Sequence, residues 1–241
     1  MNEDIRINTC NPALDSALSG GIPVGSSVLL LSDSGAGGDL LMQTILCHLT
    51  ETPSAESGVS GRLQYISSKK SADILLADLK RTFHLTAEEC DALSLCLYDA
   101  GIPEKGSLPA LLEKTAANPA GSLIFLDSLT TYLPSAGAES DFYSFFRMMN
   151  RILRVFSGQK VTCVFLLAAG ALPKEQEIQL SDLFDHIWRM SWTTEPQKPR
   201  RLLSIEKGVE DAAASPHEMV QMNAVISPDG GLAVSHLRKI V

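Results

Sequence analysis

The sequence has no long hydrophobic run: no uninterrupted apolar stretch approaches the roughly 18 residues that a membrane-spanning helix needs. The stretch from Met1 to Asp4 is acidic and lacks the basic and apolar segments of a secretion signal. Cysteine is also sparse, with five scattered residues and no Cys-x-x-Cys pair, so neither a zinc knuckle nor a disulfide framework is expected. We therefore expect a cytoplasmic protein that does not enter a membrane.

Positive charge is scarce as well, since 20 Lys and Arg residues stand against 28 Asp and Glu residues, for a net charge of −8. This balance argues against broad electrostatic binding of nucleic acid, although it is compatible with a local basic patch. Arg147, Arg151 and Arg154 form such a patch, because their spacing places them on one face of a predicted helix over 141–156. Two interpretations stay open: a face that binds RNA or an acidic partner, and a face that is only solvated.

Apolar residues make up 45% of the 241 residues, which is enough for a sizeable core. Strand and helix patterns alternate about five times and are followed by a strand-rich tail. The predicted helices cover 11–18, 38–49, 71–83, a short segment from 86, 107–117 and 141–156. The predicted strands cover 5–9, 27–31, 62–67, 93–98, 121–127, 161–168, 185–192, 201–207, 219–226 and 231–234. This order predicts a mainly parallel sheet between helices, extended by antiparallel strands at one edge. No repeat or linker divides the chain, so we expect one domain over 1–241.

A glycine-rich turn joins the strand over 27–31 to the helix that begins near Gly38, which is the layout of a phosphate-binding loop. In the register of that motif, Ser32 stands at the first glycine, Gly37 at the second, Gly38 at the lysine and Asp39 at the serine or threonine. The turn is therefore present, but the ammonium group that reaches the phosphates and the hydroxyl that binds magnesium are absent.

Carboxylates make this loop less suited to phosphate, because Asp39 replaces a neutral hydroxyl and Asp33 adds a second negative charge. A like-charge contact at roughly 4 Å costs about 1 kcal/mol in water and about 4 kcal/mol at an effective dielectric constant of about 20. We expect this change to weaken triphosphate binding. Two further interpretations are a tight turn whose Asp39 interacts with its own helix N-terminus, and a direct contact from Asp39 to magnesium.

Three segments resemble the KaiC-like branch of the RecA-like ATPases. The first is the lead-in to the loop, which consists of Leu14-Asp15 and residues 20–26. The second is 123–130, which resembles a Walker B strand, and the third is the segment 215–218. The resemblance implies a three-layer α/β/α RecA-like P-loop NTPase fold. It also implies a vestigial nucleotide site, formed by Ser34, Gly35, Gly37, Gly38, Asp39, Asp127 and Ser128.

The sequence departs from this family at further catalytic positions. The family's acidic residues after the second strand are replaced by Lys69 and Lys70, which cannot act as a base at neutral pH unless strongly desolvated. Ring-forming members also supply a Lys and an Arg to a neighbouring subunit, and here Lys207 is followed by Gly208 and Val209, without the arginine. Four catalytic positions depart together, which favours a site that no longer hydrolyses nucleotide.

Local expectations follow for the charged side chains. We expect Lys69 or Lys70 either to pair with Asp39 or to be solvated. Asp127 is expected either to bond to Ser34 or other loop groups and hold the turn closed, or to act as half of a metal site. Ser128 and Thr130 are expected to be polar neighbours or a helix cap. The histidines His84, His186 and His217 show no metal-ligand spacing, so we predict neither a metal site nor a catalytic residue.

The leading hypothesis is a catalytically inactive RecA/KaiC-like protein that acts as a scaffold or regulatory subunit. It would assemble with itself or with active paralogues, and no cofactor is expected. The first alternative is a weak ATP sensor or ATPase that holds ATP and magnesium through backbone amides and Asp127 or Asp39. The second is an RNA-binding ring subunit that uses Arg147, Arg151 and Arg154, similar to the RecA-like subunits of Elongator.

Overall fold

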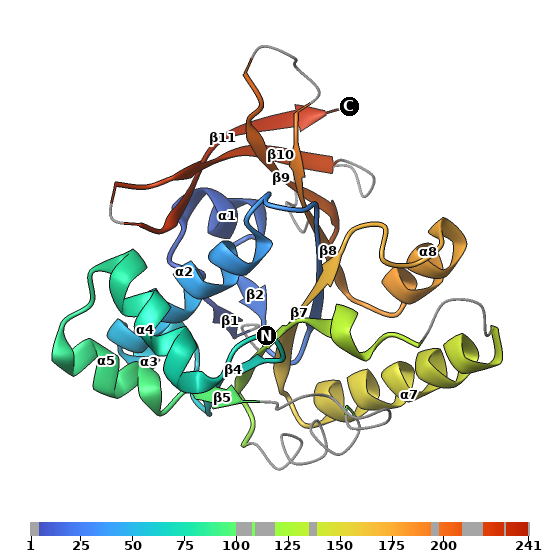
Figure 1. Cartoon of the computed structure of the whole chain (residues 1–241), viewed down its shortest axis with the longest axis horizontal. Coiled ribbons are helices and arrows are strands. Elements are labelled where there is room, and N and C mark those ends of the chain that lie inside the picture. The colour runs from blue at the N-terminus through green and yellow to red at the C-terminus, as the bar shows by residue number, and fades with distance from the viewer. Residues whose placement is uncertain are drawn as a thin grey trace.

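The computed structural model describes residues 5–99, 108, 119–134, 139–193, 198–208, 219–228 and 230–240, of which 139–140 and 236–240 are described as backbone only. Its centre is a nine-stranded sheet in the order β11-β10-β9-β8-β3-β7-β6-β4-β5 (Figure 1). The strands from β8 to β5 pair in parallel, and β8, β9, β10 and β11 pair antiparallel. The predicted mainly parallel sheet with an antiparallel edge is thereby confirmed.

The strands of this sheet have the following bounds: β3 Ser27–Ser32, β4 Leu63–Ser67, β5 Leu97–Asp99, β6 Leu123–Asp127, β7 Thr162–Ala168, β8 His186–Trp192, β9 Arg201–Lys207, β10 Met219–Ile226 and β11 Leu232–Ile240. Two short strands, β1 Arg6–Ile7 and β2 Ile22–Pro23, form a separate small sheet. The strands β3, β6 and β7 are almost entirely buried, as expected for parallel strands covered on both faces.

Helices cover both faces of the sheet. They are α1 Pro12–Ala17, α2 Gly38–Glu51, α3 Ser54–Ser57, α4 Ala72–Phe83, α5 Ala87–Ser94, the 3-10 helix η1 Leu129–Tyr132, α7 Glu139–Gly158 and α8 Lys174–Asp182. Figure 1 shows α2, α4 and α5 on one side of the parallel strands and α7 and α8 on the other. The helices and sheet form the three layers of a RecA-like α/β fold, which places the end of β3 and the start of α2 at the carboxyl edge of the sheet.

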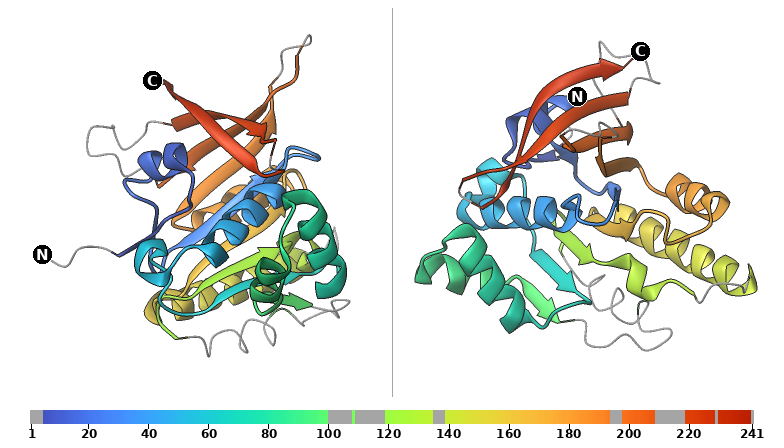
Figure 2. Two further views of the ribbon diagram at one scale, coloured as in Figure 1. Left: turned by 90° about the vertical axis from the view of Figure 1, so that its left-hand side faces the viewer. Right: turned by 45° about the horizontal axis from the view of Figure 1, so that its top comes forward.

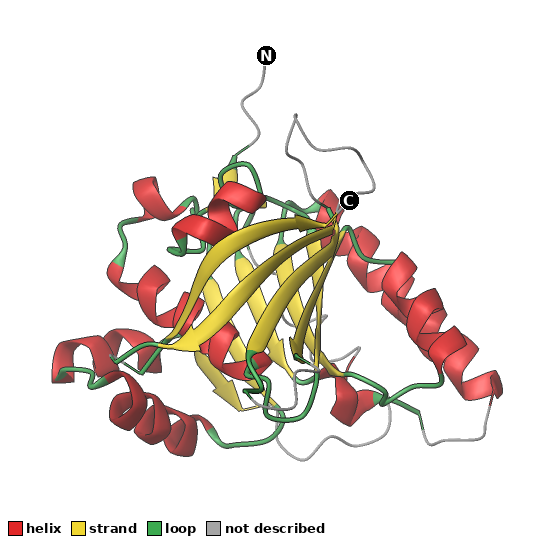
Figure 3. Cartoon of the chain, turned by 90° about the horizontal axis from the view of Figure 1, so that it is seen from above, coloured by secondary structure: helices red, strands yellow, loops and turns green. Residues whose placement is uncertain are grey.

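The β10–β11 hairpin curves over the first helices of the chain. β11 contacts both α1 and α2, and Figures 2 and 3 show the two long strands arching above this end of the molecule. Leu232 at the start of β11 donates its backbone N–H to Thr44 Oγ1 of α2 at 2.9 Å, which fastens the hairpin to the helix.

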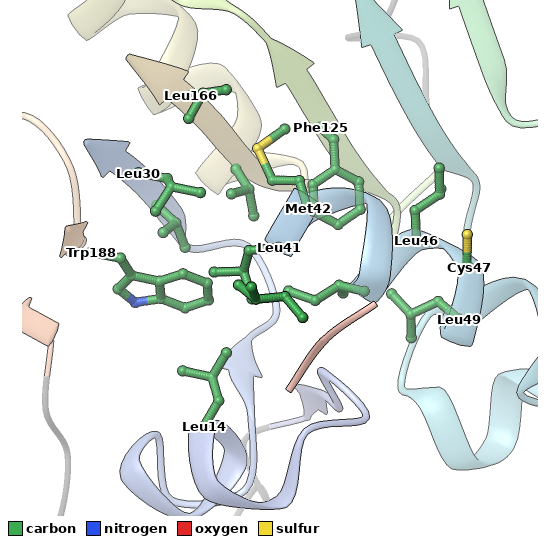
Figure 4. Close-up of a cluster of buried hydrophobic side chains, with 14 of the residues drawn as sticks. Leu14, Leu30, Leu41, Met42, Leu46, Cys47, Leu49, Phe125, Leu166 and Trp188 are labelled. Carbon is green, nitrogen blue, oxygen red and sulfur yellow. The ribbon is translucent and has the colours of Figure 1, made fainter. Parts of the chain in front are cut away.

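The core has one cluster of apolar side chains on each face of the sheet. Trp188 is the largest fully buried side chain of the cluster on the α2 face, and Figure 4 shows it beside Leu14, Leu30 and Leu41. The cluster on the other face contains the apolar side of α7 and Phe165 of β7. Burial on both faces explains why strands such as β6 consist of an apolar run without alternation.

Several elements differ from the sequence prediction, and the short elements β2, α3 and η1 are among those that were not predicted. The strand predicted over 93–98 is shorter, because the helix that begins at the capping box of Thr86 and Glu89 ends only at Ser94. Strand β5 therefore covers Leu97–Asp99. The predicted strand 231–234 extends to Ile240, and α8 was not predicted. The predicted helix over 107–117, apart from Leu108, and the segment 215–218 lie outside the described residues.

Candidate functional site

The glycine-rich loop is a tight turn between β3 and α2. Gly35 and Gly37 have φ angles of +70° and +95°, which glycine adopts without the strain that a side chain would add. The N–H of Ala36 donates to the carbonyl of Asp33 at 3.0 Å, and the N–H of Asp33 donates to the carbonyl of Met190 at 2.9 Å. The turn is therefore closed by its own backbone and fixed to the neighbouring strand β8.

Gly38, which stands at the position of the phosphate-loop lysine, has no space for a side chain. An added Cβ atom would lie 2.7 Å from Ser32 Cβ and 2.8 Å from Leu166 Cδ1. The backbone N–H of Gly38 donates to Ser32 Oγ at 3.3 Å, so one amide at the start of α2 already has a partner within the chain. The first residue of α2 therefore packs closely against β3 and β7, and only glycine fits at this position.

Asp39 interacts with the first turn of its own helix. Its Oδ1 accepts a hydrogen bond from the backbone N–H of Leu40 at 2.9 Å, and a carboxylate at this end is stabilised by the helix dipole. The prediction that Lys69 or Lys70 pairs with Asp39 is wrong, and its alternative is nearer, since both lysines are exposed and precede α4. Each lysine has another carboxylate within reach: Asp127 for Lys69 and Asp78 for Lys70, both at 2.6 Å.

Asp127, at the end of β6, lies in the centre of a buried polar group. Lys69 Nζ is 2.6 Å from its Oδ1, and Tyr65 Oη donates a hydrogen bond to its Oδ2 at 3.1 Å. The Asp127 side chain is 7% exposed, whereas that of Lys69 is 48% exposed and closes the group toward solvent. The predicted bond to Ser34 is therefore wrong, because the nearer partners come from β4 and the residues just after it.

Tyr65 connects this carboxylate to α2. Burial, followed by the negative charge of Asp127, raises the pKa of Tyr65 well above its usual value, so the phenol stays protonated and can donate. Its hydroxyl is also hydrogen-bonded to the side chain of Gln43. The result is a chain of polar contacts from Gln43 through Tyr65 and Asp127 to Lys69.

Ser128 contributes its backbone rather than its side chain. Its N–H donates to Ser68 Oγ at 2.9 Å, and Ser68 Oγ also lies 2.9 Å from Thr131 Oγ1. Ser128 stands at the start of η1 but makes no side-chain cap bond, so the predicted cap is not formed. The hydroxyl of Thr130 accepts from the N–H of Ala168 at 2.8 Å, which ties η1 to β7.

Two residues that sequence reasoning missed cover the loop. Trp192 Nε1 donates to the carbonyl of Ser34 at 3.1 Å, and the Cζ of Arg201 lies 4.6 Å from the centre of the Trp192 ring. A Cβ atom added to Gly37 would lie 3.8 Å from Arg201 Nε. Trp192 and Arg201 face each other across β8 and β9, and the usable signal was the position of Trp192 at the carboxyl end of a strand next to β3.

Lys207, the basic residue that the resemblance assigned to a neighbouring subunit, is bonded within its own chain. Its Nζ donates to the carbonyl of Phe184 at 2.6 Å and to that of Asp182 at 3.3 Å. The ammonium group therefore fastens β9 to the segment after α8. Val209 lies outside the described residues.

The arginines of α7 lie together, as their spacing predicts, on the side of α7 opposite its buried face. Arg147, Arg151 and Arg154 are exposed and form no ion pair with any carboxylate that the structure describes. Together with Asn150 and Val155 they line an open hollow of about 390 Å³.

The described residues contain no group of three or more His, Cys, Asp or Glu side chains that is arranged to hold a metal ion. All five cysteines are free thiols. Within the same part of the chain, no helix has both the length and the hydropathy needed to cross a bilayer.

The site lacks groups that magnesium and a triphosphate require. A phosphate loop needs open backbone amides, a lysine, a hydroxyl and a carboxylate free to orient the metal's water. Here Gly38 admits no side chain, Ser32 Oγ accepts from the Gly38 amide, and the ammonium group of Lys69 lies against Asp127. This arrangement does not fit a magnesium–triphosphate group.

Comparisons with known proteins agree with the fold. No protein family and no curated protein sequence matches the chain. Among solved structures, the flagellar accessory protein FlaH from Methanocaldococcus jannaschii is similar at a TM-score of 0.71 and 16% identity, over 97% of this chain and 100% of that one. The KaiC-like protein PH0186 from Pyrococcus horikoshii OT3 is similar at 0.69 and 17%, over 96% and 99%. The chain therefore has a KaiC/RecA-like fold.

Proposed function

We propose that this protein is a RecA/KaiC-like scaffold or regulatory subunit that acts through protein–protein assembly and does not hydrolyse nucleotide. The observation that carries the proposal is the 2.6 Å contact between Lys69 Nζ and Asp127 Oδ1. Asp127 ends the strand that resembles a Walker B strand, where a carboxylate would orient hydrated magnesium. An ammonium group of the chain itself takes the place of the metal's positive charge.

The glycine-rich loop after β3 supports the same proposal through its packing and its charge. The lysine that would neutralise the phosphates is missing, and Gly38 is packed too tightly against Ser32 and Leu166 to be replaced by one. Asp33 and Asp39 add negative charge at the place where a triphosphate would bring more. Without hydrolysis, the function retained by the fold is the formation of contacts with other chains.

A weak nucleotide sensor is the competing proposal. It requires Lys69 to leave Asp127, so that the carboxylate becomes available to magnesium. That step leaves a buried carboxylate, whose other oxygen is bonded to Tyr65, without its counter-charge, which is costly although Lys69 itself is half-exposed. The polar group around Asp127 therefore favours the scaffold over the sensor.

Two measurements on the full chain test the scaffold proposal: mass in solution by light scattering, and thermal unfolding, each with and without magnesium and ATP. We expect an assembly whose mass and melting temperature do not change with nucleotide, because a ligand raises the melting temperature only when it binds the native state. A nucleotide-dependent change in mass or melting temperature that Asp127→Ala abolishes would support the sensor and overturn the scaffold proposal.

A further inference from the structure

The outer surface of α7 and α8 carries opposite charges on two neighbouring helices. Figures 1 and 2 show both helices on the same side of the sheet. On α7 the buried side chains include Phe142, Met149 and Phe156, and the arginines lie on the opposite side of the helix, directed away from the sheet. This outward row consists of Arg147, Arg151 and Arg154.

The outward row of α8 is acidic at both ends and apolar between them. Leu180 is the buried residue of this helix, and the exposed row opposite to it consists of Glu175, Ile178 and Asp182. Ile178 is 52% exposed, which is unusual for a large apolar side chain on a short polar helix. The carboxylates of Glu175 and Asp182 form no ion pair with the described residues, whereas Glu177 of the same helix pairs with Arg189 inside the chain.

The two rows match in length. Arg147 and Arg154 are seven positions apart, and so are Glu175 and Asp182, which corresponds to about 10 Å along each helix. The hollow on α7 lies between the outer arginines and is lined by Asn150, Arg151 and Val155. Ile178 lies between the two acids, at the level of that hollow when the helices are placed side by side.

We propose that a second copy of this chain docks on this surface, so that α7 of each copy packs against α8 of the other around a two-fold axis. Both helices connect parallel strands and therefore run in the same direction, antiparallel to the sheet. For the outward faces of the two copies to meet with α7 against α8, the two-fold axis lies in the interface, along the helices. This symmetry makes α7 parallel to the partner copy's α8. This places Arg147 opposite Glu175, Arg154 opposite Asp182 and Ile178 against the hollow.

The same symmetry closes the assembly at two copies, since each copy presents both the basic and the acidic row. The net charge of −8 makes two copies repel each other at long range, and the local match of the basic row with the acidic row offsets this repulsion. RNA is the less favoured occupant, because a single row of three arginines is a small footprint for phosphate-driven binding. The inference rests on the assembly part of the proposed function and is independent of nucleotide.

The test is sedimentation velocity of the full chain and of charge-reversal variants. At about 50 mM salt the wild type is expected at twice the 26.0 kDa chain mass, and at about 500 mM salt the dimer should weaken, since exposed charges are screened. The triple variant Arg147→Glu, Arg151→Glu, Arg154→Glu and the double variant Glu175→Lys, Asp182→Lys are each expected to be monomers. Mixing the two variants should restore a dimer, because every row then meets a row of opposite charge.

Matched controls reverse charges on the opposite face of the sheet: Lys80→Glu with Arg81→Glu, and Glu88→Lys with Asp91→Lys, all exposed residues of α4 and α5. These variants should keep the wild-type mass. A wild type that stays monomeric, or an oligomer that both reversals leave intact, overturns the pairing of α7 with α8. The second result leaves an assembling scaffold in place, and only the interface is then wrong.

RNA binding is measured on the same samples with a single-stranded RNA probe. A monomeric wild type that retains RNA in a salt-sensitive way, with retention lost in the arginine variant, would assign the row to RNA and overturn the proposal. A wild-type dimer without RNA retention, restored on mixing the two reversal variants, would support it.

Discussion

Lys69 Nζ and Asp127 Oδ1 are 2.6 Å apart; Asp127 ends β6, and Lys69 lies two residues after the neighbouring parallel strand β4. Replacing Lys69 with Met keeps most of the side-chain volume and leaves the buried carboxylate without its counter-charge. We expect Lys69→Met to lower the free energy of unfolding by about 2 kcal/mol, below the full cost of breaking a buried pair because Lys69 is half-exposed.

Urea unfolding measures this change, and Lys70→Met is its control. Lys70 lies next to Lys69 and pairs with Asp78 at the same distance, but on the surface, where ion pairs contribute little. Equal stability losses in the two variants would show that the Lys69–Asp127 contact has no special role.

Gly38 is expected to tolerate no side chain. Gly38→Ala should cost about 1–3 kcal/mol, because the added Cβ would lie within 2.8 Å of both Ser32 Cβ and Leu166 Cδ1. Gly158→Ala is the control, since a Cβ at that position at the end of α7 meets nothing within 4 Å. Thermal unfolding should show a loss only for Gly38→Ala, and wild-type stability in that variant would mean that the loop has room for the missing lysine.

Because of the raised pKa of Tyr65, we expect the protein to lose stability at alkaline pH. Burial and the charge of Asp127 raise its pKa in the folded state, whereas in the unfolded chain a tyrosine ionises near pH 10. The stabilisation is therefore complete below about pH 10 and is lost as the pH rises above that value, because only the unfolded state releases the proton readily.

Tyr65→Phe isolates this effect. The variant should be less stable than wild type by about 1 kcal/mol at neutral pH, because Asp127 Oδ2 loses a hydrogen bond, and the difference should shrink above about pH 10. Tyr98→Phe, at an exposed tyrosine, should show neither change. A difference between wild type and Tyr65→Phe that is constant with pH would contradict the assignment.

Arg201 and Trp192 are expected to hold the glycine loop closed. Removing the guanidinium group in Arg201→Ala should cost about 1 kcal/mol, the range of a partly exposed cation–π contact. Hydrogen exchange should become faster at the backbone amides of 33–39. Arg200→Ala, which removes the exposed neighbouring arginine, is the control and should leave these amides protected.

The sequence predicts where the parts of the site lie in the fold better than it predicts which side chains contact each other there. The apolar run that forms β6 and the glycines after β3 place Asp127 and the loop at one edge of the sheet, because parallel strands end at a common edge. The partner of Asp127 depends on β4 lying next to β6 rather than next to the loop, and strand order follows from packing that no local pattern encodes.

Two other features escaped prediction for physical reasons. The sequence of α8 has only two apolar residues, Ile178 and Leu180, of which one is exposed, so it lacks the apolar periodicity that indicates a helix. Trp192 and Arg201 meet only because β8 and β9 pair antiparallel in one register, which places the indole over the loop.

The central claim is that the site around Asp127 is closed to nucleotide by the chain's own side chains. Calorimetric titration of ATP with magnesium into the full chain, together with a phosphate-release assay, tests it most directly. The account predicts no saturable heat and no turnover. A dissociation constant below about 10 µM, equivalent to about −7 kcal/mol, with turnover that Asp127→Ala abolishes, would contradict it.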